Sequence, residues 1–355
     1  MPWWMKKQTD SSCWESTMLK QTNPCQLIYL TRMTLHEIPN LKHMQGLVEL
    51  PLLNYLELFG LPNLEDMWTT TGGAEIRGDE LQAKYCFPAL STLWIRGCPR
   101  LNVVPYFPSS LERLFLRESN DQLLSSGSFS HLLPPLAHES SPCSNAHSAV
   151  PRLKELTIIK MTGSSCGWDF LQYLDALEYF NIFGSNDLTQ LPESMRSLTS
   201  LHKLIIHDCP TFGMLPEWLG ELCSLQSLFI KGTPMMDSLP QSIGCLTSLT
   251  HLTIACDNLK QLPETFHHLT SLRELDLAGC GALTALPENI GKLSALEALY
   301  VGPCSAIQCL PESIKHLTNL RRLNISGCPN LVKRCEQEVG EDWQLVSHIP
   351  NLISD

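Results

Sequence analysis

One arrangement of hydrophobic and polar positions recurs along the chain. A representative row reads Glu274, Leu275, Asp276, Leu277 and, three residues later, Cys280. Because side chains on a strand point alternately to opposite faces, the row predicts a short strand with a buried leucine face and a polar face. A Leu-Pro pair follows before the next row begins. The chain is therefore expected to turn away from the strand and to re-enter the core from the opposite side.

The rows follow each other at a fixed period of 24 residues, with one interval of 23. They begin at Leu153, Leu177, Leu201, Leu225, Leu249, Leu272, Leu296 and Leu320. Such a period indicates stacked repeats that bury their leucines against one another. Weaker copies at Leu53, Leu90 and Leu111 bring the number to about eleven. We predict an α/β repeat fold, the leucine-rich-repeat solenoid: a curved horseshoe with short parallel strands on the concave face and irregular or short helical links on the convex face.

The strength of the pattern suggests how the chain is divided. Residues 1–46 are expected to be an N-terminal flank, either partly disordered or a degenerate repeat, because the spacing of Leu27, Leu30 and Leu35 is ambiguous. Residues 47–330 are expected to form the solenoid, and residues 331–355 a C-terminal cap. Insertions near 69–88 and at 119–150 interrupt the solenoid, and loops of that length are usually functional or disordered.

The cysteines share the register of the leucines. One slot, eight residues after the leading residue, holds Cys98, Cys209, Cys280, Cys304 and Cys328, or Ser119, Ser185 and Thr233. A small side chain fits inside the turn there, and a weak donor can satisfy carbonyls that leave the sheet. Such a ladder spreads its thiols apart, so we favour this role over metal or redox chemistry. The chain has 15 cysteines, an odd number, and no C-x-x-C pair, as expected for reduced thiols in a cytosolic protein.

The Leu-x-x-Leu-x-Leu-x-x-Cys rows, with links such as LPESM and LPENI, resemble the C-terminal repeats of plant nucleotide-binding leucine-rich-repeat immune receptors. The tail from Cys328 through His348 to Asn351 is similar to the ending of the coiled-coil class of these receptors. The resemblance covers roughly residues 47–355. It implies a protein-interaction scaffold that recognises a pathogen effector or a host protein, or that holds the receptor's own nucleotide-binding domain inactive. In such a cap, Trp343 and Ile349 would cover the last hydrophobic ring.

The chain departs from these receptors in one respect. It has no phosphate-binding loop of the form G-x-x-x-x-G-K-[ST], because its Gly291-Lys292 pair is followed by Leu293. We therefore expect no cofactor. The ring of residues around Leu47 to Leu58 has no cap comparable to the C-terminal one, so the solenoid is expected to have followed another domain. The alternative is a stand-alone intracellular leucine-rich-repeat signalling scaffold.

Composition limits the partners and the compartment. The 355 residues include 36 acidic and 25 basic ones, a formal charge of −11. No broad basic surface is expected, which argues against nucleic acid and membrane surfaces as partners. Neither a signal-peptide core nor a membrane span is found in the sequence. The repeats also lack the Leu-x-Gly-x-Ile-Pro link of extracellular plant repeats, so we predict a cytoplasmic protein.

Three patterns suggest chemistry at first sight. Residues 163–167 match G-x-S-x-G, so Ser165 could be a hydrolase nucleophile. The motif falls on the link between two rows, however, so we rank this alternative third and predict no enzyme. His267 and His268 also lie in a link without a third ligand nearby, and no metal site is expected. Glutamates recur once per period after a proline, as acids favoured at the start of short helices: Glu193, Glu217, Glu264, Glu288 and Glu312.

The outward strand positions are the strongest candidates for function, because the core does not need their side chains. Aromatic residues on such a face have the character of interface anchors. The candidate protein-binding residues are Trp94, Arg96, Phe115, Arg117, Phe183, Ile205, His207, Phe229, Lys231 and Tyr300. They make the N-terminal and middle strands basic and aromatic, although the whole chain is acidic. The alternative is that these aromatic residues pack on one another or under the insertions.

Overall fold

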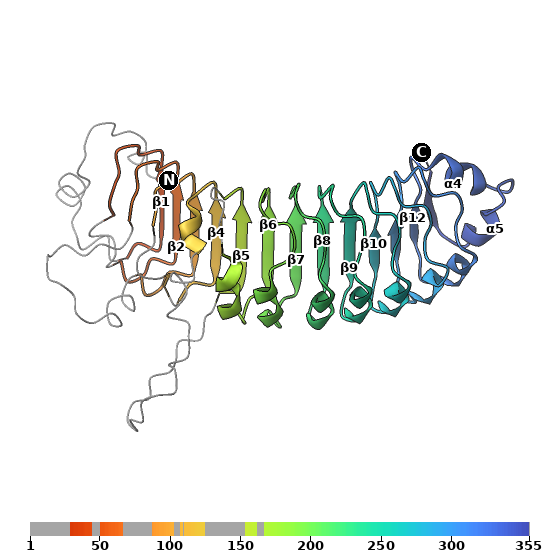
Figure 1. The fold of residues 1–355 in the computed structure, drawn as a ribbon, viewed down its shortest axis with the longest axis horizontal. Helices are drawn as coiled ribbons and strands as arrows, with labels where there is room; N and C mark the ends of the chain where they lie inside the picture. Colours follow the sequence, from red (N-terminus) through yellow and green to blue (C-terminus); the bar gives the residue numbers. More distant parts are fainter. Residues whose placement is uncertain are drawn as a thin grey trace, which may run out of the picture. The chain divides into compact units, whose positions relative to one another are not determined.

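The computed structural model describes residues 29–44, 50–66, 87–102, 107–108, 110–124, 153–161 and 167–354. The described residues form thirteen short strands, joined by turns and short helices (Figure 1). The chain divides into two compact units, Met1–Leu177 and Glu178–Asp355. Most of the two predicted insertions lies outside the described residues.

In the first unit, five parallel strands pair in the order of the sequence. They are β1 (Arg32–His36), β2 (Tyr55–Phe59), β3 (Thr92–Arg96), β4 (Arg113–Arg117) and β5 (Glu155–Ile159). The second and fourth residues of each strand are buried. Strand β1 lies within the segment expected to be a flank, yet it carries the same alternation: Met33 and Leu35 are buried and pair with Leu56 and Leu58.

The second unit repeats the arrangement with eight parallel strands. They are β6 (Tyr179–Phe183), β7 (Lys203–His207), β8 (Ser227–Lys231), β9 (His251–Ala255), β10 (Glu274–Asp276), β11 (Ala298–Tyr300), β12 (Arg322–Asn324) and β13 (Asn351–Ile353). The leucines of neighbouring rows lie directly opposite each other: Leu204 pairs with Leu228, and Leu228 with Leu252. Each is at most 1% exposed, so the stack of rows forms one leucine core within the unit.

The links in the second unit are 3-10 helices rather than α-helices. They are η6 (Glu193–Ser197), η7 (Glu217–Glu221), η8 (Gln241–Cys245), η9 (Glu264–His268), η10 (Ile290–Lys292) and η11 (Glu312–His316). Proline precedes all but η10, and its fixed φ suits the start of a helix. The predicted glutamates start four of these helices; Glu288 lies just before η10. In the first unit, η3 (Asp121–Leu124) and η5 (Trp168–Tyr173) are also 3-10 helices.

After the last Leu-rich row, two short α-helices precede strand β13. They are α4 (Pro329–Arg334) and α5 (Trp343–Val346), and α5 packs against η11. Ile349 is buried and Trp343 is half-buried. The carboxylate of Asp342, 4% exposed, accepts hydrogen bonds from Arg334 Nε at 2.8 Å and from the Leu310 amide at 3.3 Å. The hydrogen bond from Leu310 ties the tail to the preceding row, whereas the ion pair of Asp342 with Arg334 lies within the tail.

The cysteine ladder takes the predicted role. The thiol of Cys280 donates to the carbonyl of Ile254 at 3.1 Å, and the amide of Cys304 donates to the sulfur of Cys328 at 3.2 Å. Burial raises the pKa of the Cys280 thiol to about 12. Cys256 also belongs to the ladder, because its sulfur lies 3.0 Å from the hydroxyl of Thr233. Its row is one residue short, so Cys256 follows the leading leucine by seven residues and the eight-residue spacing does not identify it.

The residue that the row of Cys256 lacks is the one that has a positive φ in most other rows. In most rows the residue just before the ladder slot has a positive φ, as at Gly97 (64°), Asp208 (53°) and Gly279 (92°). Glycine is favoured there because other residues are strained in this region. The row that begins at Leu249 lacks this position, which explains the single interval of 23 residues.

Candidate protein-binding face

The first, third and fifth residues of the strands form the face of the sheet opposite the buried leucines; we call it the outer face. In the strands of five residues these positions are exposed or half-buried, with a few exceptions such as Thr157, which is 5% exposed. All ten predicted binding residues lie on this face. Six belong to strands β6, β7, β8 and β11 of the second unit, and four to strands β3 and β4 of the first.

In the first unit, Trp94 stacks on Phe115. The two residues are paired in register on neighbouring strands, their ring centroids are 3.9 Å apart and the ring planes differ by 17°. Packing of aromatic residues on one another, the alternative to binding, is therefore realised at this pair. Trp94 is nevertheless 39% exposed, so the stack still presents apolar surface to solvent.

Arginines lie on the same face of these strands. The guanidinium of Arg96 lies over the ring of Phe59, 4.7 Å from its centroid, and that of Arg32 lies 3.8 Å from the centroid of Tyr55. Such cation–π contacts hold the arginine side chains in place. The outer face of strands β1–β5 carries four arginines and two glutamates: Arg32, Arg96, Arg113, Arg117, Glu57 and Glu155. This unit therefore presents a basic, aromatic face although the whole chain is acidic.

Three of the predicted residues form a line of rings in the second unit. The ring of His207 lies 5.7 Å from that of Phe183 and 5.9 Å from that of Phe229. Ile205 is half-buried and pairs with Phe229, while Lys231, which pairs with His207, is exposed. The structure thus brings these five residues together on three adjacent strands.

Tyr300 lies apart from that line, on β11. Its hydroxyl accepts a hydrogen bond from Arg322 Nη1 at 2.9 Å. Arg322 is not among the residues predicted to bind, because those occupy only the third and fifth strand positions. The first position of the strands adds further side chains, which are exposed at Arg32, Arg113, Tyr179, His251 and Arg322 and half-buried at Tyr55. The same periodicity, read two residues earlier, would have identified them.

The other motifs do not form a site among the described residues. Ser165 and most of its motif lie outside them. His267 Nδ1 lies 2.6 Å from the carbonyl oxygen of Glu264, within its own link. In the described part of the chain, no three His, Cys, Asp or Glu side chains are placed to hold a metal ion. No helix there has the length and apolar character needed to cross a bilayer.

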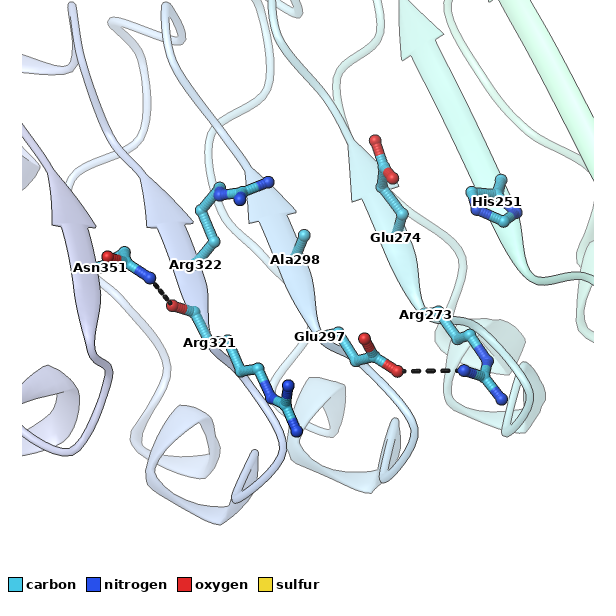
Figure 2. A pocket seen from close by; sticks show the side chains of 8 residues that line it. All are labelled: His251, Arg273, Glu274, Glu297, Ala298, Arg321, Arg322 and Asn351. Carbon is cyan, nitrogen blue, oxygen red and sulfur yellow. Dashed lines mark hydrogen bonds and ion pairs between the residues drawn. The ribbon is translucent and has the colours of Figure 1, made fainter.

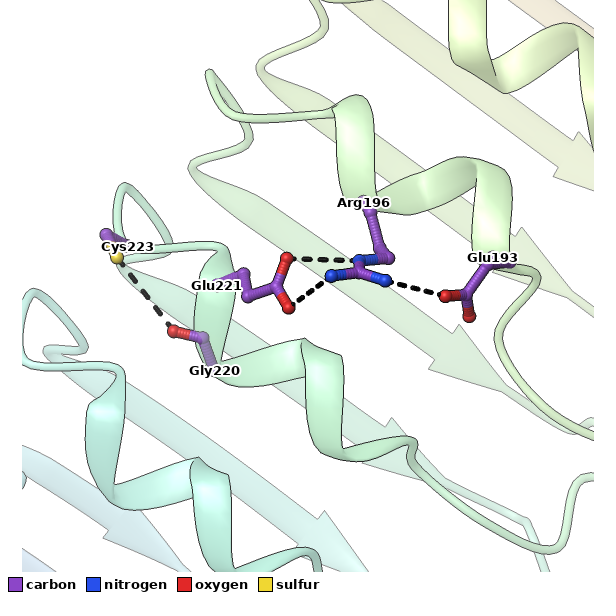
Figure 3. Close-up of polar contacts among 5 residues, drawn as sticks. All are labelled: Glu193, Arg196, Gly220, Glu221 and Cys223. Carbon is purple, nitrogen blue, oxygen red and sulfur yellow. Dashed lines mark hydrogen bonds and ion pairs between the residues drawn. The ribbon is translucent and has the colours of Figure 1, made fainter.

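The links carry charged contacts of their own, which Figure 3 shows for η6 and η7. Arg196 donates to Glu193 at 2.9 Å and, through two nitrogens, to Glu221 at 2.6 and 3.0 Å. These carboxylates raise the pKa of the arginine. All three side chains are exposed, and such pairs contribute little to stability. They connect successive links, and the cluster of one arginine and two glutamates keeps a net charge of −1.

No protein-family model matches the sequence, and no curated protein matches it. Solved structures do. The leucine-rich-repeat domain of the type III effector XopL is 27% identical, with a TM-score of 0.50 over 75% of this chain and 77% of that chain. An internalin from Listeria monocytogenes is 18% identical, with a TM-score of 0.49 over 87% of this chain and 88% of that one. A leucine-rich-repeat protein of Leptospira interrogans is 16% identical, with a TM-score of 0.38 over 92% and 90% of the two chains.

The parallel strands, the short helical links and the likeness to the XopL domain confirm the predicted fold class, a leucine-rich-repeat solenoid. This fold suggests a protein-interaction scaffold, and scaffolds of this kind are generally not enzymes. The matched effector domain is bacterial, so this comparison does not extend to a plant origin.

Proposed function

We propose that this chain is the protein-interaction scaffold of a cytoplasmic plant immune receptor. It recognises a pathogen effector or a host protein, or it holds the receptor's nucleotide-binding domain inactive. The repeat links and the tail support this setting, because both resemble the coiled-coil class of plant receptors. A stand-alone intracellular signalling scaffold would use the same face.

The observation that carries the binding role is the exposed stack of Trp94 and Phe115 beside arginines. The leucines fill the core without these side chains, so folding does not require two large rings on the outer face. Tryptophan and arginine are over-represented among the residues that dominate binding energy at protein interfaces. The face therefore has the composition of a binding surface.

The stack is also preorganised. Trp94 and Phe115 already rest on each other, and the ring of Phe59 holds Arg96 in place. Fewer side-chain rotamers must be frozen when a partner binds, so less of the contact energy is lost to ordering. A partner that lays an apolar side chain over Trp94 would gain most from this arrangement.

The test compares the double variant Trp94→Ala and Phe115→Ala with the control Arg196→Ala on the links. Each full-length chain is used to capture proteins from plant-cell extract, and the captured proteins are quantified by mass spectrometry. We expect one set of proteins to bind the wild type and the control but to fall by about 30-fold in affinity with the double variant, as for a loss of about 2 kcal/mol. Capture of the same proteins at the same affinity by all three chains would refute a binding role for this face. Circular dichroism establishes that the variants remain folded.

A further inference from the structure

One face of the Trp94 ring meets no other ring in the described part of the chain. Trp94 pairs in register with Glu57 on β2 and with Phe115 on β4. Phe115 covers one face of the indole, because the two ring planes differ by 17° and their centroids are 3.9 Å apart. Since Phe115 belongs to β4, the other face of the indole is turned toward β2 and the position of Glu57.

The side chain of Glu57 is held away from this second face. Its Oε2 accepts a hydrogen bond from the Tyr55 hydroxyl at 3.1 Å, and its Oε1 lies 3.8 Å from Nε2 of His36. Tyr55 is on β2 itself and His36 is on β1, so both contacts draw the carboxylate away from β3. The position beside the indole is therefore open, in agreement with the 39% exposure of Trp94.

The spacing of the strands suits a flat group in this position. Neighbouring strands lie about 4.8 Å apart, which is close to the separation of two stacked rings. A further ring above Glu57 would continue the column that Phe115 and Trp94 begin, and it would touch the whole face of the indole. A branched aliphatic side chain would touch only part of that face. Stacking of two rings adds roughly 2- to 12-fold in affinity beyond the burial of apolar area.

The charges beside the open position decide between an aromatic ring and a cation, the two kinds of group that bind an indole face. The guanidinium of Arg32 lies over the ring of Tyr55, at 3.8 Å from its centroid. That of Arg96 lies over the ring of Phe59, at 4.7 Å. Tyr55 and Phe59 stand two residues before and two residues after Glu57, so an arginine lies on either side of its carboxylate. Two positive charges thus accompany one negative charge, and a further cation is disfavoured.

We propose that the free face of Trp94 is a subsite for one aromatic side chain of a protein partner. The ring of that side chain stands in the column above Glu57 and becomes the third ring of the stack with Trp94 and Phe115. This subsite rests on the proposed protein-binding role and specifies the kind of side chain that the partner supplies.

A hollow on the outer face of the second unit offers no comparable subsite (Figure 2). It measures about 440 Å³ and surrounds Ala298, which pairs in register with Glu274 and Arg322. No phenylalanine, tyrosine or tryptophan lines this hollow, and the guanidinium groups of Arg321 and Arg322 point away from each other. The hollow therefore presents neither a ring face nor a pair of converging charges.

The test uses the full chain and three tripeptides, Ac-Gly-Phe-Gly-NH₂, Ac-Gly-Leu-Gly-NH₂ and Ac-Gly-Lys-Gly-NH₂. Nuclear magnetic resonance follows the indole N–H signal of Trp94, assigned from Trp94→Leu. We expect a saturable shift with the phenylalanyl peptide and binding roughly 2- to 12-fold weaker with the leucyl peptide. The lysyl peptide should bind more weakly than both. Equal binding of the phenylalanyl and leucyl peptides, or tightest binding of the lysyl peptide, would overturn the proposal.

The decisive variant is Glu57→Phe, which places a ring of the chain itself in the open position. It should abolish the shift caused by the phenylalanyl peptide. Thr253→Phe is the matched control, because it adds the same ring at the third position of β9 and should leave the shift unchanged. An undiminished shift in Glu57→Phe would refute the proposal.

A second variant keeps the test decisive if circular dichroism shows that Glu57→Phe does not fold. In Trp94→Leu, the preference for the phenylalanyl over the leucyl peptide should disappear, as followed by saturation transfer to the peptide signals. Persistence of this preference would mean that the peptides bind elsewhere, and the proposal would fall.

Capture of partner proteins separates this subsite from the proposed function. Glu57→Phe should lower the capture of the same proteins that the double variant of Trp94 and Phe115 loses. If the double variant loses them and Glu57→Phe retains them, the face binds its partner without an inserted ring, and only the subsite is overturned. Tripeptide binding at Trp94 without any effect of the double variant on capture would instead count against the proposed function.

Discussion

Gly244 offers a sharp test of how the repeats stack. It lies buried in η8, against η9 of the next repeat. A Cβ atom at this position would be 2.9 Å from Thr265 Cβ and closer still to the Thr265 carbonyl oxygen. The obstacle is main chain, which cannot move aside by changing a rotamer. The substitution Gly244→Ala therefore requires η8 and η9 to separate by about 1 Å.

Two effects oppose each other in this variant. Alanine favours a helical backbone by up to about 1 kcal/mol relative to glycine. Overpacking costs about 1–3 kcal/mol, and here it falls at the upper end, because separation also strains the hydrogen bond of 2.5 Å from Thr265 Oγ1 to the Gln241 carbonyl. We expect a net loss of about 2 kcal/mol in the free energy of unfolding. For a unit of this size that lowers Tm by about 4–8 °C.

The measurement is thermal unfolding followed by circular dichroism, with hydrogen exchange to locate the change. Gly281→Ala is the matched control, because its Cβ would meet only the Asp257 carbonyl oxygen, at an ordinary 3.8 Å. This control should be neutral or slightly stabilising. If Gly244→Ala were as stable as the wild type, close packing of the links would not be what selects glycine there.

Three further predictions follow from the described contacts. Cys280, whose pKa is raised to about 12 by burial, should react with iodoacetamide far more slowly than the exposed Cys223, as read by mass spectrometry; equal rates would contradict the ladder. Arg334→Met should lower the midpoint of urea unfolding, because the carboxylate of Asp342 stays buried without its partner; an unchanged midpoint would contradict a stabilising role of this ion pair. Glu217→Gln should cost about 0.5–1 kcal/mol at neutral pH, because the carboxylate caps two amides of η8 at 2.9 and 3.1 Å. Those bonds lower the pKa of Glu217 below its usual 4.5. The contribution of Glu217 to the free energy of unfolding is therefore present above pH 4.5 and is lost as the pH falls through the lowered pKa. If the stabilities of variant and wild type did not converge in acid, this reasoning would be contradicted.

The sequence by itself determined the repeat. A one-residue shift would turn the leucines out of the core, so the alternation fixes which side chains are buried and where each strand lies. The ladder slot and the glutamates at the links follow from the same register. All of these are local properties of a row, and they recur in most rows, with Gln241 in place of the glutamate in one of them. In the row that is one residue short, the fixed spacing of eight residues does not identify Cys256 as a member of the ladder.

Only the tertiary structure decided how the outer face works, since it depends on which rows become neighbours and on where each long side chain settles. The sequence placed Trp94 and Phe115 in one column but could not show that they stack while Trp94 stays exposed. It also could not show that Ala298 leaves a hollow, which exists only because Glu274 and Arg322 flank it. The core is specified by the alternation of residues along one row. A surface site is specified by differences between rows, and the side chains that differ come into contact only when the rows are stacked.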